Sequence, residues 1–159
     1  METLQISKEN ALKAYEEAGD KTKKVLSNLF GAKTFLKNAT ERIKSYEDAC
    51  EDQGIEPLEL SDFDFLPVAD RKHAFASHKL TVIIKALNEG WVPDWKNGSQ
   101  YKYYGWFKQV GSGAGFSYDD YVYGYSVTTV GSRLCFKSRE LAEYAGKQFI
   151  NEYNDYLTL

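Results

Sequence analysis

Half of the aromatic residues of this chain lie in one stretch, residues 91–125, which reads WVPDWKNGSQYKYYGWFKQVGSGAGFSYDDYVYGY. The stretch holds 12 of the 24 aromatic residues, including all three tryptophans, and Gly, Ser and Lys are interleaved with them. Aromatic residues favour strands because their rings pack on the pleated surface of a sheet. The stretch therefore predicts a small sheet with an aromatic-lined surface.

The hydrophobic period in and after this stretch predicts three antiparallel strands. The runs 101–108, 121–127 and 133–137 alternate residue by residue, as expected where successive side chains point to opposite faces of a sheet. The glycine-rich segments 111–115 and 130–132 supply the positive-φ positions that tight turns require. We therefore expect a three-stranded meander.

Helical patterns surround the predicted sheet. Capping residues and glycines bound three helices at 7–19, 20–31 and 38–54, and the longest apolar stripe runs from Pro67 to Gly90, as in a central packing helix. A last helix begins at Ser138, and its apolar residues share one side: Leu141, Ala142, Ala145, Phe149, Tyr153 and Tyr156.

These elements predict an α+β class with an N-terminal helical segment, a long central helix and a small antiparallel three-stranded meander covered by a C-terminal helix. We expect Gly146 to bring that last helix close to the sheet, because an interior glycine otherwise destabilises a helix. The length of 159 residues fits a single domain, 1–159. Within it we expect a helical part, 1–54, an acidic linker, 55–67, and an α+β core, 68–159.

Charge and composition limit the function classes. Hydrophobic residues at 43% and charged residues at 27% describe an ordinary globular chain. The net charge is −3; residues 91–137 carry five Lys and Arg against three Asp, so they contribute +2 and the remainder −5. We expect no duplex DNA partner, because such proteins present a strongly basic surface. No apolar run suits a membrane span or a signal peptide, so we expect a cytoplasmic protein.

No catalytic or metal motif stands out. The GSGAG segment at 111–115 is followed by a strand pattern, whereas a phosphate loop precedes a helix. His73 and His78 are five residues apart, which separates them on a helix. Cys50 and Cys135 lack a metal or redox spacing and indicate buried free thiols. We expect no cofactor and no metal; an enzyme would have to assemble its acid and base from Asp94, Asp119, Asp120, His73 and His78.

The aromatic stretch offers the candidate binding residues. Rings on both faces of a small sheet leave two alternatives open, plain packing and a binding surface. The candidate binding residues are Trp91, Trp95, Lys102, Tyr104, Trp106, Lys108, Tyr121, Tyr123 and Arg133. Such rings anchor protein interfaces, and with Lys or Arg nearby they also stack bases.

Four segments carry a resemblance: ISKENALKAYEEAGDKTKKVLSNLFG, ALNEGWVPDW, QYKYYGWF and VGSRLCFKSRELAEYAGKQF. Over residues 7–157 the chain resembles an uncharacterised family of small proteins from phages and prophages of Bacteroides-type gut bacteria. Gly105 stands where that family has proline. The resemblance implies a phage product in the cytoplasm of an infected bacterium or in the virion, and it implies no catalytic residue.

We therefore expect a non-enzymatic, phage-type interaction protein, either a virion or assembly component or a host-directed factor, that uses the aromatic-rich sheet surface. Its partner would be another protein or a second copy. The alternative is a binder or sponge of a nucleotide, a cyclic nucleotide signal or a short single strand, with rings as stacking platforms and Lys or Arg on phosphate. A pocket lined by rings and at least one Lys or Arg would favour the alternative.

Overall fold

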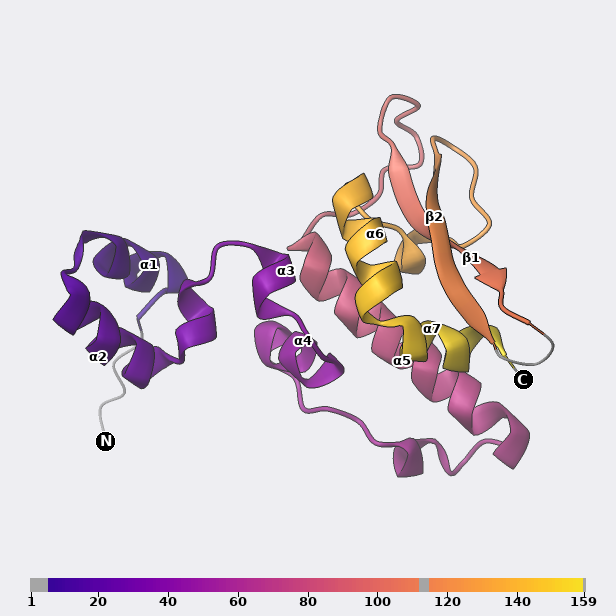
Figure 1. The fold of residues 1–159 in the computed structure, drawn as a ribbon, viewed down its shortest axis with the longest axis horizontal. Coiled ribbons are helices and arrows are strands. Elements are labelled where there is room, and N and C mark those ends of the chain that lie inside the picture. Colours follow the sequence, from indigo (N-terminus) through magenta and orange to yellow (C-terminus); the bar gives the residue numbers. More distant parts are fainter. Residues whose placement is uncertain (1–5, 112–114, 159) are drawn as a thin grey trace. The chain divides into compact units, whose positions relative to one another are not determined.

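The computed structural model describes residues 6–111 and 115–158, and the chain divides into two compact units, Met1–Arg42 and Ile43–Leu159 (Figure 1). The glycine segment predicted as a turn at 111–115 includes residues 112–114, which lie outside the described residues.

The first unit is a short helical hairpin with a small core. It comprises α1 (Lys8–Glu17), α2 (Asp20–Phe30), the 3-10 helix η1 (Ala32–Phe35) and α3 (Ala39–Arg42). The predicted helices at 7–19 and 20–31 are confirmed. The buried ring of Phe35 stacks on Tyr15, with centroids 4.0 Å apart and planes 8° from parallel. This stack joins the end of the hairpin to α1.

The predicted helix at 38–54 is wrong as a single element, because it forms α3 and α4 (Tyr46–Gln53). Ser45 separates the two. Its hydroxyl accepts from the Asp48 backbone N–H at 3.1 Å, and the Asp48 carboxylate accepts from the Ser45 N–H at 3.2 Å. This reciprocal cap starts a new helix, since the Ser45 backbone is extended.

The second unit is built in layers. The 3-10 helix η2 (Leu60–Phe63) leads into α5 (Val68–Asn88), the long helix that the apolar stripe predicted. On one side α5 contacts α4, and on the other it contacts α6 (Arg139–Gln148) and α7 (Ile150–Leu157). Figure 1 shows α6 and α7 next to the hairpin of β1 (Lys102–Gln109) and β2 (Phe116–Gly124), which they also contact.

The sheet has two strands, so the prediction of three is not confirmed, although the α+β class agrees. The predicted third strand, 133–137, begins in the 3-10 turn η3 (Ser132–Leu134) and pairs with β1 through Phe136 and Tyr103 alone. The turn η3 ends at Leu134 and Ser138 already caps α6, so only residues 135–137 can extend beside β1. The side chain of Asn88 binds the opposite edge of this short segment. It donates to the Cys135 carbonyl at 2.9 Å and accepts from the Lys137 N–H at 3.0 Å. The end of α5 therefore occupies the edge of residues 135–137 that faces away from β1.

The predicted C-terminal helix is divided at Phe149, whose φ of −109° and ψ of 33° interrupt the helical path between α6 and α7. Ser138 caps α6 as expected, accepting from the Leu141 N–H at 3.4 Å. The expected close approach at Gly146 is also present. A Cβ placed there would overlap the ring of Tyr118 on β2.

Candidate ligand pocket

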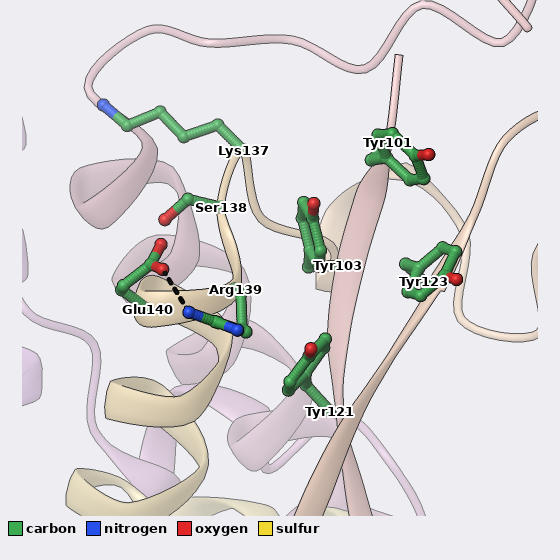
Figure 2. Close-up of a pocket in the computed structure, with 8 residues that line it drawn as sticks. All are labelled: Tyr101, Tyr103, Tyr121, Tyr123, Lys137, Ser138, Arg139 and Glu140. Carbon is green, nitrogen blue, oxygen red and sulfur yellow. Dashed lines mark ion pairs between the residues drawn. The ribbon is translucent and has the colours of Figure 1, made fainter. Parts of the chain in front are cut away.

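A pocket of about 440 Å³ opens between the β1–β2 hairpin and the start of α6 (Figure 2). It is lined by Tyr101, Tyr103, Tyr121, Tyr123, Lys137, Ser138, Arg139 and Glu140. We call it the tyrosine pocket. One wall consists of four aromatic rings and the other of polar and charged side chains, so a ligand in it would meet both kinds of surface.

Strand pairing places the four rings on one face. Tyr103 of β1 lies opposite Tyr123 of β2, and Tyr121 precedes Tyr123 by two residues on β2. Residues two apart on a strand point to the same face. The Tyr103 centroid lies 5.9 Å from that of Tyr121 and 6.0 Å from those of Tyr101 and Tyr123. Tyr101 and Tyr123 are 42% and 49% exposed, so their ring surfaces are accessible to a ligand.

The charged wall is positioned by contacts from two distant elements. Phe136 donates to and accepts from the backbone of Tyr103 at 2.7 and 3.1 Å. Asn88 holds the next residue, Lys137, and Ser138 then caps α6. Because Phe136, Lys137 and Ser138 each make at least one hydrogen bond, the backbone of the polar wall has a defined position opposite the rings.

Each cation of the wall has a carboxylate neighbour. Lys137 Nζ lies 2.9 Å from Glu89 Oε2, and the Arg139 guanidinium lies 3.3 Å from Glu140 Oε1. Arg139 Cζ also lies 5.7 Å from the centroid of the Tyr121 ring, within the range of cation–π attraction.

Hydrogen bonds set the protonation of these groups. A hydrogen bond with Tyr121 raises the pKa of Arg139. The backbone N–H of Glu140 itself, and then the Ser138 side chain, lower the pKa of the Glu140 carboxyl. Next to the pocket, the Tyr125 hydroxyl donates to Tyr101 at 3.2 Å, and this contact raises the pKa of Tyr125 to about 12. At neutral pH the phenol of Tyr125 is therefore neutral, whereas Arg139 and Glu140 in the pocket wall are charged.

A second, apolar hollow of about 190 Å³ lies elsewhere on the hairpin. It is lined by Tyr104, Gly105, Trp106, Phe107, Phe116, Thr129, Val130 and Leu157. Trp106 is 52% exposed, whereas Tyr104 is buried. Even and odd positions of β1 point to opposite faces, which separates Tyr104 and Trp106 from the ring wall of the tyrosine pocket.

The structure does not bring the candidate binding residues from the sequence together in one site. Tyr121 and Tyr123 line the tyrosine pocket, and Tyr104 and Trp106 line the apolar hollow. Lys108 is ion-paired with Asp119 at 2.6 Å. Two further candidates, Trp91 and Arg133, line neither space; Trp91 is half-buried and Arg133 is exposed.

Lys102 differs most from its predicted role on a ligand phosphate. It is 1% exposed, and its ammonium donates to the carbonyls of Asp94, Asn97 and Gln100 at 2.5, 3.2 and 2.8 Å. The same ammonium lies 5.3 Å from the ring centroid of Trp95, whose Nε1 donates to Ser132 Oγ at 2.6 Å. Lys102 and Trp95 thus hold the loop before β1 in place.

Six pocket residues were not among the candidates: Tyr101, Tyr103, Lys137, Ser138, Arg139 and Glu140. The sequence pattern could have indicated two of them. Tyr101 and Tyr103 are two residues apart and therefore point to the same face of the hairpin, on which Tyr103 lies opposite the candidate Tyr123. The pattern could not have indicated the four polar residues, since their place depends on Asn88 at the end of α5.

Three of the five acid and base candidates have separate partners. Asp119 pairs with Lys108, Asp120 accepts from the Tyr121 N–H at 2.8 Å, and His73 Nδ1 lies 2.9 Å from the Tyr156 carbonyl oxygen. Over residues 6–111 and 115–158, no group of three or more His, Cys, Asp or Glu side chains could hold a metal ion.

The cysteines are buried free thiols, as expected: both side chains are fully buried and unpaired. Burial raises the pKa of Cys135 to about 11, which disfavours the reactive thiolate. None of the helices in the described part of the chain combines the length and the apolar character that crossing a bilayer demands.

Comparison with protein-family models, curated proteins and solved structures found no match to this chain.

Proposed function

We propose that this protein is a non-enzymatic binder of a nucleotide-like ligand, a ring-containing molecule that carries polar or anionic groups, in the tyrosine pocket. The observation that carries the proposal is the meeting of four tyrosine rings with the Arg139 guanidinium in one pocket, which Lys137 also lines. This combination is the one that favours ligand binding over a purely protein-binding sheet surface.

The size and the ring wall suit such a ligand. A volume of about 440 Å³ lies within the range of about 300 to 1,000 Å³ for small-molecule sites. Stacking of a base on an aromatic side chain contributes about 1 to 3 kcal/mol, and any base can stack because each has a π-face. The half-exposed rings of Tyr101 and Tyr123 and the neighbouring Tyr103 and Tyr121 offer such faces.

The polar wall supplies complementary hydrogen-bonding groups. Arg139 has a planar set of donors that matches phosphate and base-edge acceptors. Glu140 accepts hydrogen bonds from ring or exocyclic N–H groups when ionised. In the phage setting that the sequence resemblance implies, a protein of this kind would bind a host or phage nucleotide in the infected cell.

Thermal-shift and calorimetric titration with the four ribonucleoside 5′-monophosphates tests the proposal. We expect at least one to raise the melting temperature, because a ligand at 100 times its Kd stabilises by about 2.7 kcal/mol. Tyr121→Ala should weaken that binding by about 5- to 150-fold, the equivalent of about 1 to 3 kcal/mol. Trp106→Ala, in the apolar hollow, is the control and should bind normally. Absence of any shift, or equal losses in both variants, would contradict the proposal.

A second function, contact with a protein partner or a second copy, is favoured by the apolar hollow. Trp106 and Leu157, both lining it, are 52% and 39% exposed. A half-exposed tryptophan beside a hollow is typical of an interface anchor. Size-exclusion chromatography with light scattering, combined with pull-down from bacterial lysate, should show association that Trp106→Ala weakens and Tyr121→Ala does not. A strict monomer that retains no partner would contradict this function.

A further inference from the structure

The ammonium of Lys137 does not face the tyrosine rings. In Figure 2 the Lys137 side chain extends away from the four tyrosines, and its Nζ lies 2.9 Å from Glu89 Oε2. The backbone of Lys137 is held by Asn88, the last residue of α5. The backbone of Lys137 is therefore fixed, and only its side chain can move. The ion pair with Glu89 determines where the Lys137 ammonium lies.

Glu89 occupies a backbone position that favours glycine. It ends α5 in the left-handed conformation, with φ 50° and ψ 48°, and it is the one non-glycine residue with positive φ in the described part of the chain. Glycine is the usual residue at such a helix end. The Glu89 side chain is 39% exposed, so burial of its stem does not account for a glutamate there. Its carboxylate forms the ion pair with Lys137.

We infer that Glu89 is a specificity-determining residue of the tyrosine pocket, which competes with the anionic group of a ligand for Lys137. The inference rests on the proposed function of this pocket. An uncharged ring ligand can stack on the tyrosines while Lys137 stays paired with Glu89. A phosphate-bearing ligand can form an ion pair with Lys137 only if the Lys137 ammonium leaves Glu89. The Glu89 carboxylate also repels the negative charge of such a ligand. Glu89 thus lowers affinity for anions relative to uncharged ligands.

The test compares nucleosides with their 5′-monophosphates by calorimetry, using adenosine with AMP and guanosine with GMP. In Glu89→Gln the monophosphate that binds wild type should bind up to about five-fold more tightly, the range of a surface ion pair. The matching nucleoside should bind unchanged. Adding Lys137→Met to Glu89→Gln should abolish the gain in monophosphate affinity. The Lys137 ammonium, which Glu89→Gln frees to contact the phosphate, is absent from the double variant.

Two further variants separate the specific effect from general ones. Glu143→Gln removes the same charge from a surface ion pair outside the pocket, Glu143 with Lys147 at 2.5 Å, and should leave nucleotide affinity unchanged. Glu89→Gly should raise both the melting temperature and the monophosphate affinity, because glycine suits this backbone. A gain in both quantities cannot come from a damaged fold.

The outcomes distinguish the two ideas. If wild type binds a monophosphate and Glu89→Gln leaves its affinity unchanged, the inference is wrong and the proposed function stands. An equal gain for nucleoside and monophosphate would also overturn the inference, because it would show no discrimination by charge. If wild type binds none of these ligands, both the proposed function and the inference fail.

Discussion

Lys102→Met is expected to lower the free energy of unfolding by about 1 to 3 kcal/mol, the range for leaving buried acceptors without their hydrogen-bond donor. Lys102 is 1% exposed, and its ammonium donates to the carbonyls of Asp94, Asn97 and Gln100. Methionine fills much of the same space but donates no hydrogen bond. The carbonyls would lose their charged donor, which is the larger part of the expected cost.

Urea denaturation followed by tryptophan fluorescence measures this loss directly, because all three tryptophans lie between residues 91 and 106. Lys108→Met is the matched control on the same strand. Lys108 is 63% exposed and pairs with Asp119 at the surface, so its loss should cost no more than about 1 kcal/mol. If the two variants lose equal stability, the carbonyl contacts of Lys102 do not hold the loop before β1.

Phe149→Ala should cost about 3 to 5 kcal/mol, because truncating a buried phenylalanine loses apolar burial and leaves a cavity. Phe149 is 2% exposed and lies at the junction of α6 and α7, edge-on to the ring of Tyr144 with centroids 6.1 Å apart. A typical domain is stable by about 5 to 15 kcal/mol. The variant would therefore lose much of its stability.

Chemical denaturation of Phe149→Leu and Phe65→Ala calibrates that result. Phe149→Leu keeps most of the buried volume and should lose much less than Phe149→Ala. Phe65 is 79% exposed, and its truncation should stay within about 0.5 kcal/mol of wild type, as for surface substitutions. A Phe149→Ala protein within 1 kcal/mol of wild type would contradict the packing of the C-terminal helices described here.

Elements with a complete local signal could be predicted from the sequence. The stripe of α5 and the caps and glycines around α1 and α2 predicted these helices, since periodicity and capping depend on residues within a few positions. Ser45 is an instructive exception. It forms a capping box with Asp48 within the range of local signals, yet the longer helical pattern across 38–54 concealed it.

The candidate site could be predicted only in part. The aromatic stretch directed attention to the correct hairpin, and Tyr121 and Tyr123 were among the candidates that line the pocket. Lys102 was assigned to a ligand because strand parity does not say which face is covered. The loop carbonyls that bury its ammonium come from residues two to eight positions earlier, in a segment with no regular pattern.

By itself, the sequence determined α1, α2 and α5, and it predicted two long strands in the aromatic stretch, because each of these depends on neighbours a few residues apart. The second strand was predicted at 121–127 and runs over Phe116–Gly124. Only the tertiary structure decided that residues 133–137 form no third strand and that Arg139 and Glu140 lie on the wall opposite the rings. Asn88 is 47 residues from Cys135 and 49 from Lys137, and it occupies their backbone groups. Contacts over that separation leave no local pattern in the sequence, and they position the backbone of the pocket wall.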